Sequence, residues 1–168
     1  PEIKQKVVEL TANAKSSLEK IAVLAAFVQR EIRYVAIEIG IGGYQPHPAP
    51  DVFANRYGDC KDKVTLLSTM LREVGIESYY LLVHGTRGVV ARDFPSMTNF
   101  NHVILAIKLP DDVSAISLYC LYQHQQLGRL LLFDPTHPMV PLGYLPPSLE
   151  ANYGLLVREG GGELVRLP

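Results

Sequence analysis

The stretch Tyr57–Lys63 reads YGDCKDK and runs directly into apolar residues at helical spacing. Those apolar positions are Val64, Leu67, Met70, Leu71 and Val74. The pattern predicts a helix that begins near Asp62 and ends before Gly75, a residue typical of the position after a helix. Cys60 then lies at the N-terminal end, where free N–H groups and about half a positive charge favour a thiolate. We expect Cys60 to be reactive, although any small residue at a helix start would fit this position.

The two cysteines have contrasting surroundings. Cys60 has two lysines and two aspartates as near neighbours, and because their charges oppose one another the sequence does not determine the sign of the electrostatic potential at the thiol. Cys120 lies in the apolar run Ile116–Tyr122, which is typical of a buried, inert thiol. Two cysteines form at most one disulfide, so the sequence shows no disulfide framework and does not indicate the compartment.

The segments on either side of Cys60 predict helices first and strands afterwards. Upstream, Leu18–Ile32 has the 3.6-residue period of a helix and is preceded by serines that can cap it. A β-like run over Tyr34–Ile39 follows, and the Gly- and Pro-rich segment Gly40–Pro50 predicts a loop. Downstream, the predicted strands are Ile76–Val83, Val103–Ile107, Ser117–Tyr122 and Arg129–Phe133, with a terminal hairpin around Gly160–Gly162. This order predicts one α+β domain with an antiparallel sheet and helices on one side.

A cysteine nucleophile needs a base within hydrogen-bond reach and a group that orients the base. His102 begins a predicted apolar strand, which would hold its side chain on a rigid element at an edge. Asp134 follows the apolar run Leu130–Phe133, and a carboxylate there can fix an imidazole tautomer. Each residue alone also has a simpler explanation, as a structural histidine and as a turn aspartate before Pro135. Three other histidines are predicted to be exposed in loops or turns: His47, His124 and His137.

The composition predicts a folded domain without a nucleic-acid or membrane partner. The chain has 168 residues, 48% of them hydrophobic, which is typical of one globular domain. Its 16 basic and 17 acidic residues give a net charge of −1, without the basic excess typical of nucleic-acid binding. No run of about 18 apolar residues is present, so we expect no membrane insertion. Because the chain begins at Pro1 and not at Met, we expect it to belong to a longer protein with additional domains.

Three segments together resemble transglutaminase-like proteins. Tyr57–Lys63 is similar to the nucleophile segment of this superfamily, Asn101–Val103 to its histidine strand and Phe133–Thr136 to its aspartate strand. The order Cys, His, Asp is also the family's order, and the resemblance extends over about Leu18–Pro138. It implies a papain-like α+β core, here a single domain over residues 1–168, in which the nucleophile helix packs against the sheet. Further segments resemble the bacterial branch, where a β-rich domain usually precedes this one: Ile32–Tyr34, Gly40–Tyr44 and Pro141–Gly143.

The resemblance implies acyl transfer by a catalytic triad of Cys60, His102 and Asp134. Cys60 would attack an amide or peptide carbonyl to form a thioester, while His102 moves the proton and Asp134 orients the imidazole. The backbone N–H of Cys60 is one expected oxyanion donor. The chain has no Trp, the residue that some relatives use as the second donor. The candidates for that second donor are Tyr44, Gln45 and Tyr34.

Hydrolysis of a peptide or protein substrate is the reaction that we expect, because water always competes as the acyl acceptor and no acceptor site is evident. Transamidation, which cross-links proteins, and a non-catalytic peptide-binding module are the alternatives. A zinc site built from Cys60, His102 and Asp134 is a further alternative, but the chain has no CxxC or HxxxH spacing. We therefore expect neither a metal nor a cofactor.

Overall fold

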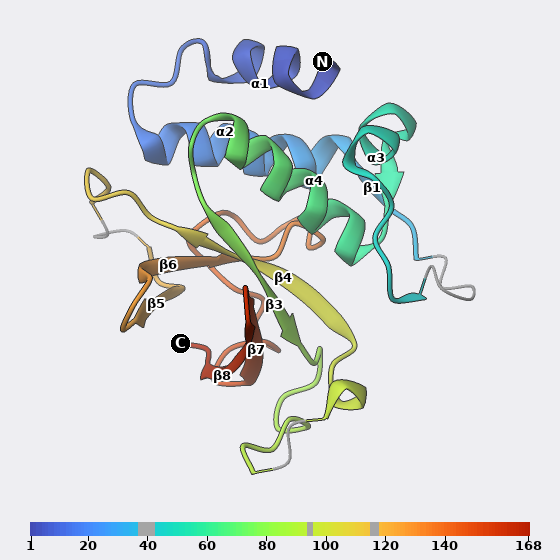
Figure 1. Cartoon of the computed structure of the whole chain (residues 1–168), viewed down its shortest axis with the longest axis vertical. Helices are drawn as coiled ribbons and strands as arrows, with labels where there is room; N and C mark the ends of the chain where they lie inside the picture. Colours follow the sequence, from blue (N-terminus) through green and yellow to red (C-terminus); the bar gives the residue numbers. More distant parts are fainter. Residues whose placement is uncertain (37–42, 94–95, 115–117) are drawn as a thin grey trace.

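The computed structural model describes residues 1–36, 43–93, 96–114 and 118–168. The helices are α1 (Glu2–Thr11), α2 (Ser17–Glu31), α3 (Ala49–Asn55) and α4 (Cys60–Glu73), with a 3₁₀ turn η2 at Met97–Asn99. The strands of the main sheet are β3 (Ser78–Val83), β4 (His102–Lys108), β5 (Leu121–His124), β6 (Gly128–Phe133), β7 (Tyr153–Arg158) and β8 (Gly161–Arg166). Within the described ranges, the helices form a layer on one side of this six-stranded antiparallel sheet (Figure 1). The predicted α+β class is confirmed.

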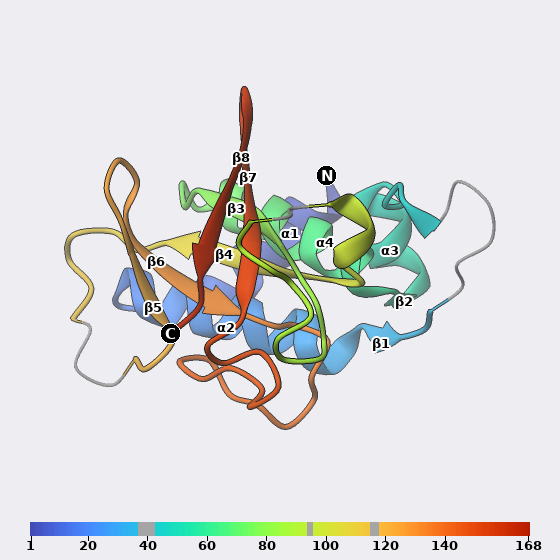
Figure 2. The same cartoon turned by 90° about the horizontal axis from the view of Figure 1, so that it is seen from below.

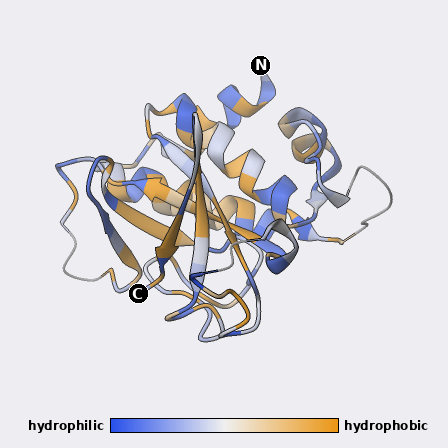
Figure 3. Cartoon of the chain, turned by 60° about the horizontal axis from the view of Figure 1, so that its bottom comes forward, coloured by the Kyte–Doolittle hydropathy of each residue, from blue (hydrophilic) through white to orange (hydrophobic). Residues whose placement is uncertain are grey.

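The central strand of the sheet is buried on both faces. The strand order is β5-β6-β4-β3-β7-β8, and α4 packs directly against β3 and β4, with α1 and α2 packed on α4. On β4, residues 104–107 are fully buried, and the neighbouring strands share this apolar character (Figure 3). Strands buried on both faces are continuous apolar runs because neither face meets water. The predicted strand over Val103–Ile107 is therefore confirmed, with one more residue at each end.

The sheet curls until its two edges meet. β5 and β8 lie at opposite ends of the strand order, yet the His124 Nε2 atom lies 3.0 Å from the Glu163 Oε2 atom. His124 Nδ1 also accepts the backbone N–H groups of Gln126 and Leu127. His124 is 3% exposed, so the prediction of an exposed turn residue is wrong. The β7–β8 hairpin, which the sequence predicts, projects from this curled sheet (Figure 2).

Two helices were not predicted from the sequence pattern. α1 buries Ile3 and Val7 against the other helices. None of the helices in the described ranges is long and apolar enough to cross a membrane. α3 begins at Ala49, inside the segment where prolines and glycines predict a loop. Pro50 lies in the first turn of α3, where a missing N–H breaks no helical hydrogen bond.

Two predicted strands differ from the structure. Instead of a strand over Tyr34–Ile39, only Arg33–Tyr34 (β1) is extended in a ladder, and residues 37–39 lie outside the described ranges. β5 begins at Leu121, later than the predicted Ser117, which also lies outside those ranges.

A short parallel ladder fixes the backbone in front of α4. β1 pairs with β2 (Tyr57–Gly58), and the N–H of Val35 donates to the carbonyl oxygen of Gly58 at 2.9 Å. The ladder joins the end of α2 to the start of α4, and it ends two residues before Cys60.

Candidate active site

Cys60 is the first residue of α4, which begins two residues earlier than the sequence pattern indicates. The helix start is fixed by a capping box: the Asp59 carboxylate accepts the N–H of Asp62, and the Asp62 carboxylate accepts the N–H of Asp59, both at 3.2 Å. Reciprocal caps of this kind satisfy two backbone donors that a helix start leaves free. The Cys60 side chain, on a residue 8% exposed, is thereby held at the helix N-terminus.

Gly58 is required by the close approach of this cap. A Cβ atom added at Gly58 would lie 2.5 Å from the Cβ atom of Asp62, a distance that real Cβ atoms do not tolerate. Asp62 is itself 3% exposed and also accepts the N–H of His47 at 2.8 Å, so it has little room to move. Gly58 therefore lets the Asp62 side chain approach the backbone closely enough to form the cap at the start of α4, next to Cys60.

His102 is the first residue of β4 and lies opposite Val83 of β3. Its Nε2 atom lies 2.9 Å from the Oδ2 atom of Asp134. The Cys60 side chain lies near enough to the imidazole to raise the pKa of His102 through a hydrogen bond and its charge. The structure thus brings together the three residues that the sequence predicted, in the order thiol, imidazole, carboxylate.

Asp134 directly follows β6, the neighbour of β4 in the sheet, and is held by a residue that the sequence interpretation did not single out. The Thr136 N–H and hydroxyl donate to the Oδ1 atom of Asp134 at 2.9 and 2.6 Å. The second carboxylate oxygen, Oδ2, then remains for His102. An Asp-x-Thr sequence after a strand is a common turn in which the side chains bond the local backbone, and this was the available signal for Thr136.

The charges of this cluster reinforce one another. Burial disfavours the charged imidazole of His102, but hydrogen bonds to Asp134 and Cys60 outweigh burial and raise its pKa to about 10. Burial also favours neutral Asp134, yet the hydrogen bonds from His102 and Thr136 hold its pKa below the ordinary value. At neutral pH the pair is an imidazolium and a carboxylate. An imidazolium beside a sulfur atom, at a helix N-terminus, is the arrangement that favours a thiolate.

A buried lysine lies behind this cluster. Lys63 is 1% exposed, and its Nζ atom donates to the carbonyl oxygens of Gln29 and Ile32, at 3.2 and 2.6 Å, at the end of α2. The carbonyl end of a helix carries partial negative charge, which stabilises a cation there. Burial lowers the pKa of Lys63 to about 8, an effect that the negative charge of Asp134 partly opposes. The sequence pattern gave no sign that this lysine is buried.

Gln29 connects the same helix end to the segment after Asp134. Its side-chain Nε2 atom donates to the carbonyl oxygens of His137 and Val140, at 2.5 and 2.7 Å. Its own carbonyl oxygen accepts from Lys63. α2 therefore anchors both the helix that carries the thiol and the loop that follows the carboxylate.

Cys60 and His102 lie in the wall of a cleft of about 700 Å³. Its other lining residues are Gly43, Tyr44, Pro46, Lys61, Thr65, Tyr80, Leu82, Thr98, Phe100, Asn101 and Val103. Of the predicted oxyanion donors, Tyr44 lines the cleft but is 91% exposed. Gln45 and Tyr34 are not among the described residues that line it. The backbone N–H groups of the first turn of α4 have no acceptor within the helix and are available to an oxyanion.

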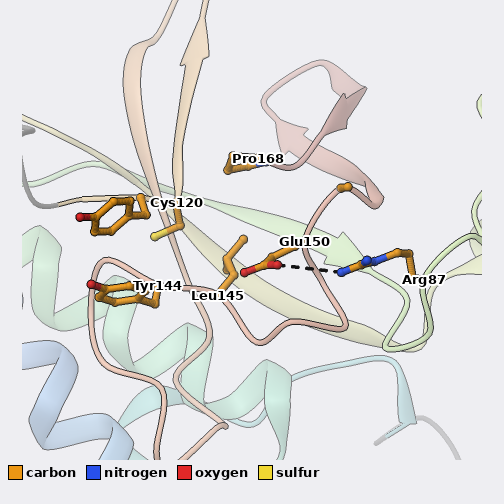
Figure 4. Close-up of a pocket in the computed structure, with 8 residues that line it drawn as sticks. Arg87, Cys120, Tyr144, Leu145, Glu150 and Pro168 are labelled. Atoms are coloured by element: carbon orange, nitrogen blue, oxygen red, sulfur yellow. Dashed lines mark ion pairs between the residues drawn. The ribbon is translucent and has the colours of Figure 1, made fainter.

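Cys120 has a different environment. Its Sγ atom donates to the carbonyl oxygen of Leu132 at 3.0 Å, and burial raises the pKa of this thiol to about 11. Figure 4 shows Cys120 beside Tyr144 in a smaller cavity, where Arg87 and Glu150 form an ion pair. Among the described residues, no cluster of three or more His, Cys, Asp or Glu side chains is arranged to hold a metal ion.

A sequence profile of the Transglutaminase-like superfamily matches residues 4–112. The chain belongs to this superfamily. A comparison with curated proteins found no match. Two solved structures resemble the transglutaminase-like chain along 99% of its length. One, from Parabacteroides distasonis and provisionally described as a protease, is 16% identical with a TM-score of 0.65. The other, from Cytophaga hutchinsonii and provisionally described as a cysteine protease, is 13% identical with a TM-score of 0.54.

At these identities the likeness shows the fold, and the predicted papain/transglutaminase-like core is confirmed. The transglutaminase-like chain spans 27% of the first structure and 42% of the second, so both relatives carry additional chain.

Proposed function

We propose that this chain is a cysteine hydrolase that cleaves amide or peptide bonds through a thioester on Cys60. The observation that carries the proposal is the cluster of Cys60, His102 and Asp134, in which Cys60 and His102 lie together in a cleft wall and His102 bonds the buried Asp134. The rise in the pKa of His102 to about 10, caused in part by both neighbours, agrees with this geometry. Membership of the transglutaminase-like superfamily supports a cysteine enzyme in general.

The geometry supports a two-step acyl transfer. The Cys60 thiolate attacks the carbonyl carbon, and His102 donates its proton to the departing amine as the C–N bond breaks. Neutral His102 then takes a proton from water, whose oxygen attacks the thioester and releases the acid, restoring thiolate and imidazolium. Asp134 keeps the imidazole oriented and stabilises its charge throughout. The N–H groups at the start of α4 stabilise the oxyanion, and Tyr44 remains a candidate for an additional donor.

An amine in place of water would give transamidation, and a chain without chemistry at Cys60 would be a peptide-binding module. We favour hydrolysis because water reaches an open cleft and is always the more concentrated acceptor. The domain boundaries, the peptide or protein nature of the substrate and a role for additional domains in the full-length protein belong to the same proposal.

The first test is the pH profile of iodoacetamide labelling at Cys60, read by peptide mass spectrometry in wild type and His102→Ala. We expect labelling of Cys60 well below the pH at which ordinary thiols react, and a shift to higher pH in His102→Ala. Cys120 is the internal control, because its buried thiol should label only in denaturant. Identical, ordinary profiles in both proteins would contradict an activated nucleophile.

The second test is hydrolysis of a mixture of peptides, followed by mass spectrometry with and without added primary amines. Cys60→Ala should lower the rate by about three orders of magnitude or more, whereas Cys120→Ala should retain it. Predominant amine incorporation would replace hydrolysis with transamidation. Absence of both products, with Cys60 labelling intact, would favour the binding module.

A further inference from the structure

The catalytic cleft extends from His102 into a recess between α4 and β3. Tyr80 and Leu82 are two residues apart on β3 and therefore face the same side of the sheet. That side faces α4, because the Tyr80 hydroxyl lies 2.9 Å from the Thr65 hydroxyl on α4. Leu82 is also the register partner of Val103, the residue after His102. His102, Leu82 and Val103 all line the same cleft, so the recess shares its cavity with the imidazole and has aliphatic side chains in its wall.

Hydroxyl contacts join α4 and β3 at this recess. The Thr65 hydroxyl donates to the carbonyl oxygen of Lys61 at 2.7 Å, so its oxygen accepts the Tyr80 O–H. Beyond that pair, the Ser78 hydroxyl donates to the Ser68 hydroxyl at 2.9 Å. The hydroxyl protons of Thr65, Tyr80 and Ser78 are therefore donated to acceptors within the protein.

The charges of the cleft are already paired within the protein. Lys61 is the lysine among the described lining residues, and its Nζ atom forms an ion pair with Asp59. His102 is paired with Asp134. A charged substrate side chain in the recess would lose its hydration without gaining a partner, which is unfavourable. Phe100, another lining residue, adds an aromatic surface that favours apolar groups.

We propose that this recess, the subsite formed by Thr65, Tyr80, Leu82, Phe100 and Val103, binds an apolar side chain of the substrate next to the bond that is cleaved. The substrate class is then peptides with an aliphatic or aromatic residue at the cleavage site. This inference rests on the proposed function for its meaning, but binding alone can test it. Hydrophobic pockets discriminate between side chains by roughly 10–200-fold.

The test uses Cys60→Ala, which binds peptides without turning them over, in isothermal titration calorimetry. Three peptide pools are identical except at one varied position, which holds Leu and Phe, Asp and Glu, or Lys and Arg. We expect the apolar pool to bind at least about tenfold more tightly than either charged pool. Equal affinities, or tighter binding of a charged pool, would overturn the proposal.

Substitution of Leu82 locates the preference. In the Cys60→Ala background, Leu82→Glu should remove the advantage of the apolar pool and improve binding of the basic pool. Val157→Glu places the same change on β7, outside the cleft, and should leave the ratio as it was. If Leu82→Glu does not fold, Phe100→Ala should lower the ratio by several-fold. A ratio that neither cleft substitution changes places the preference elsewhere and refutes this subsite.

The two proposals fail separately. Wild-type protein that labels at Cys60 but hydrolyses no peptide refutes the hydrolase, while the calorimetric preference would still stand. Hydrolysis without preference for apolar residues at the cleavage site refutes the subsite and leaves the hydrolase intact.

Discussion

Replacing Lys63 by methionine tests whether a buried charge lies behind the candidate active site. The side chain is 1% exposed, and its Nζ atom bonds two carbonyl oxygens at the end of α2. Methionine has similar length but no charge, so Lys63→Met removes both the cost of burying the ammonium group and its hydrogen bonds. The loss of the hydrogen bonds shifts the stability of the variant by a constant amount, whereas the charge makes a contribution that depends on pH.

The magnitude follows from the pKa of Lys63, which burial lowers from 10.5 to about 8. At about 1.4 kcal/mol per pH unit, this difference corresponds to about 3 kcal/mol. Below pH 8 the lysine is protonated in the folded and unfolded states, and the full cost of burial is present. Between pH 8 and 10.5 the folded state binds fewer protons than the unfolded state, so the free energy of unfolding rises with pH. Wild type should therefore gain about 3 kcal/mol relative to Lys63→Met over this window.

Urea denaturation followed by circular dichroism, for both proteins at about pH 7 and about pH 10.5, measures this gain. Comparing the two proteins at each pH cancels the other groups that titrate in the same window. Lys4→Met, on the exposed side of α1, is the matched control and should show the same stability difference at both pH values. A wild-type gain below about 0.5 kcal/mol would refute a buried, charged lysine at this position.

Three further predictions concern the residues around the thiol. Because the pKa of His102 is raised to about 10, the charged imidazole stabilises the fold fully below its unfolded pKa of 6.5, and this stabilisation is lost as the pH rises through about 10. We expect kcat/KM to fall over the same pH range, as the imidazole loses its proton. A fall in kcat/KM near pH 7 would contradict the charged imidazole. Thr136→Val removes the hydroxyl that donates to Asp134, and in steady-state kinetics it should lower kcat about tenfold with KM little changed. An unchanged kcat would show that Thr136 does not position Asp134. Gly58→Ala forces a contact with Asp62 and should lower the stability measured by thermal unfolding by about 1–3 kcal/mol. Gly75→Ala is the control: Gly75 has a positive φ but no close neighbour, so its substitution measures the cost of backbone strain without a clash.

The parts of the site that were predictable have local signals. The start of α4 was predicted within two residues because the apolar spacing and a terminal glycine agree. The sequence predicted that His102 begins an apolar strand and that Asp134 follows another, and the family resemblance implied that the two act together. The structure explains their approach, since β4 and β6 are antiparallel neighbours. A residue that begins one such strand then lies at the same sheet edge as a residue that follows the other.

The parts that were missed depend on distant chain. The sequence gives no reason to expect that the charged side chain of Lys63 is buried. Its burial is explained by the carbonyl groups at the end of α2, which lie 34 and 31 residues earlier in the chain. His124 looks like a turn residue until the curl of the sheet brings Glu163 to it. α3 has prolines at its start, and composition alone does not distinguish a loop from a helix that begins with them.

The double anchoring on Gln29 has a consequence for how the site forms during folding. Its contacts reach residues 34, 108 and 111 positions away in the chain, so they close large loops. Contacts of such separation form slowly because the entropy of loop closure opposes them until the rest of the fold is in place. We expect α4 to become helical early in refolding, with Cys60 still an ordinary thiol. Thiol reactivity should then appear only with the final cooperative step, so that a partly folded chain carries no active nucleophile.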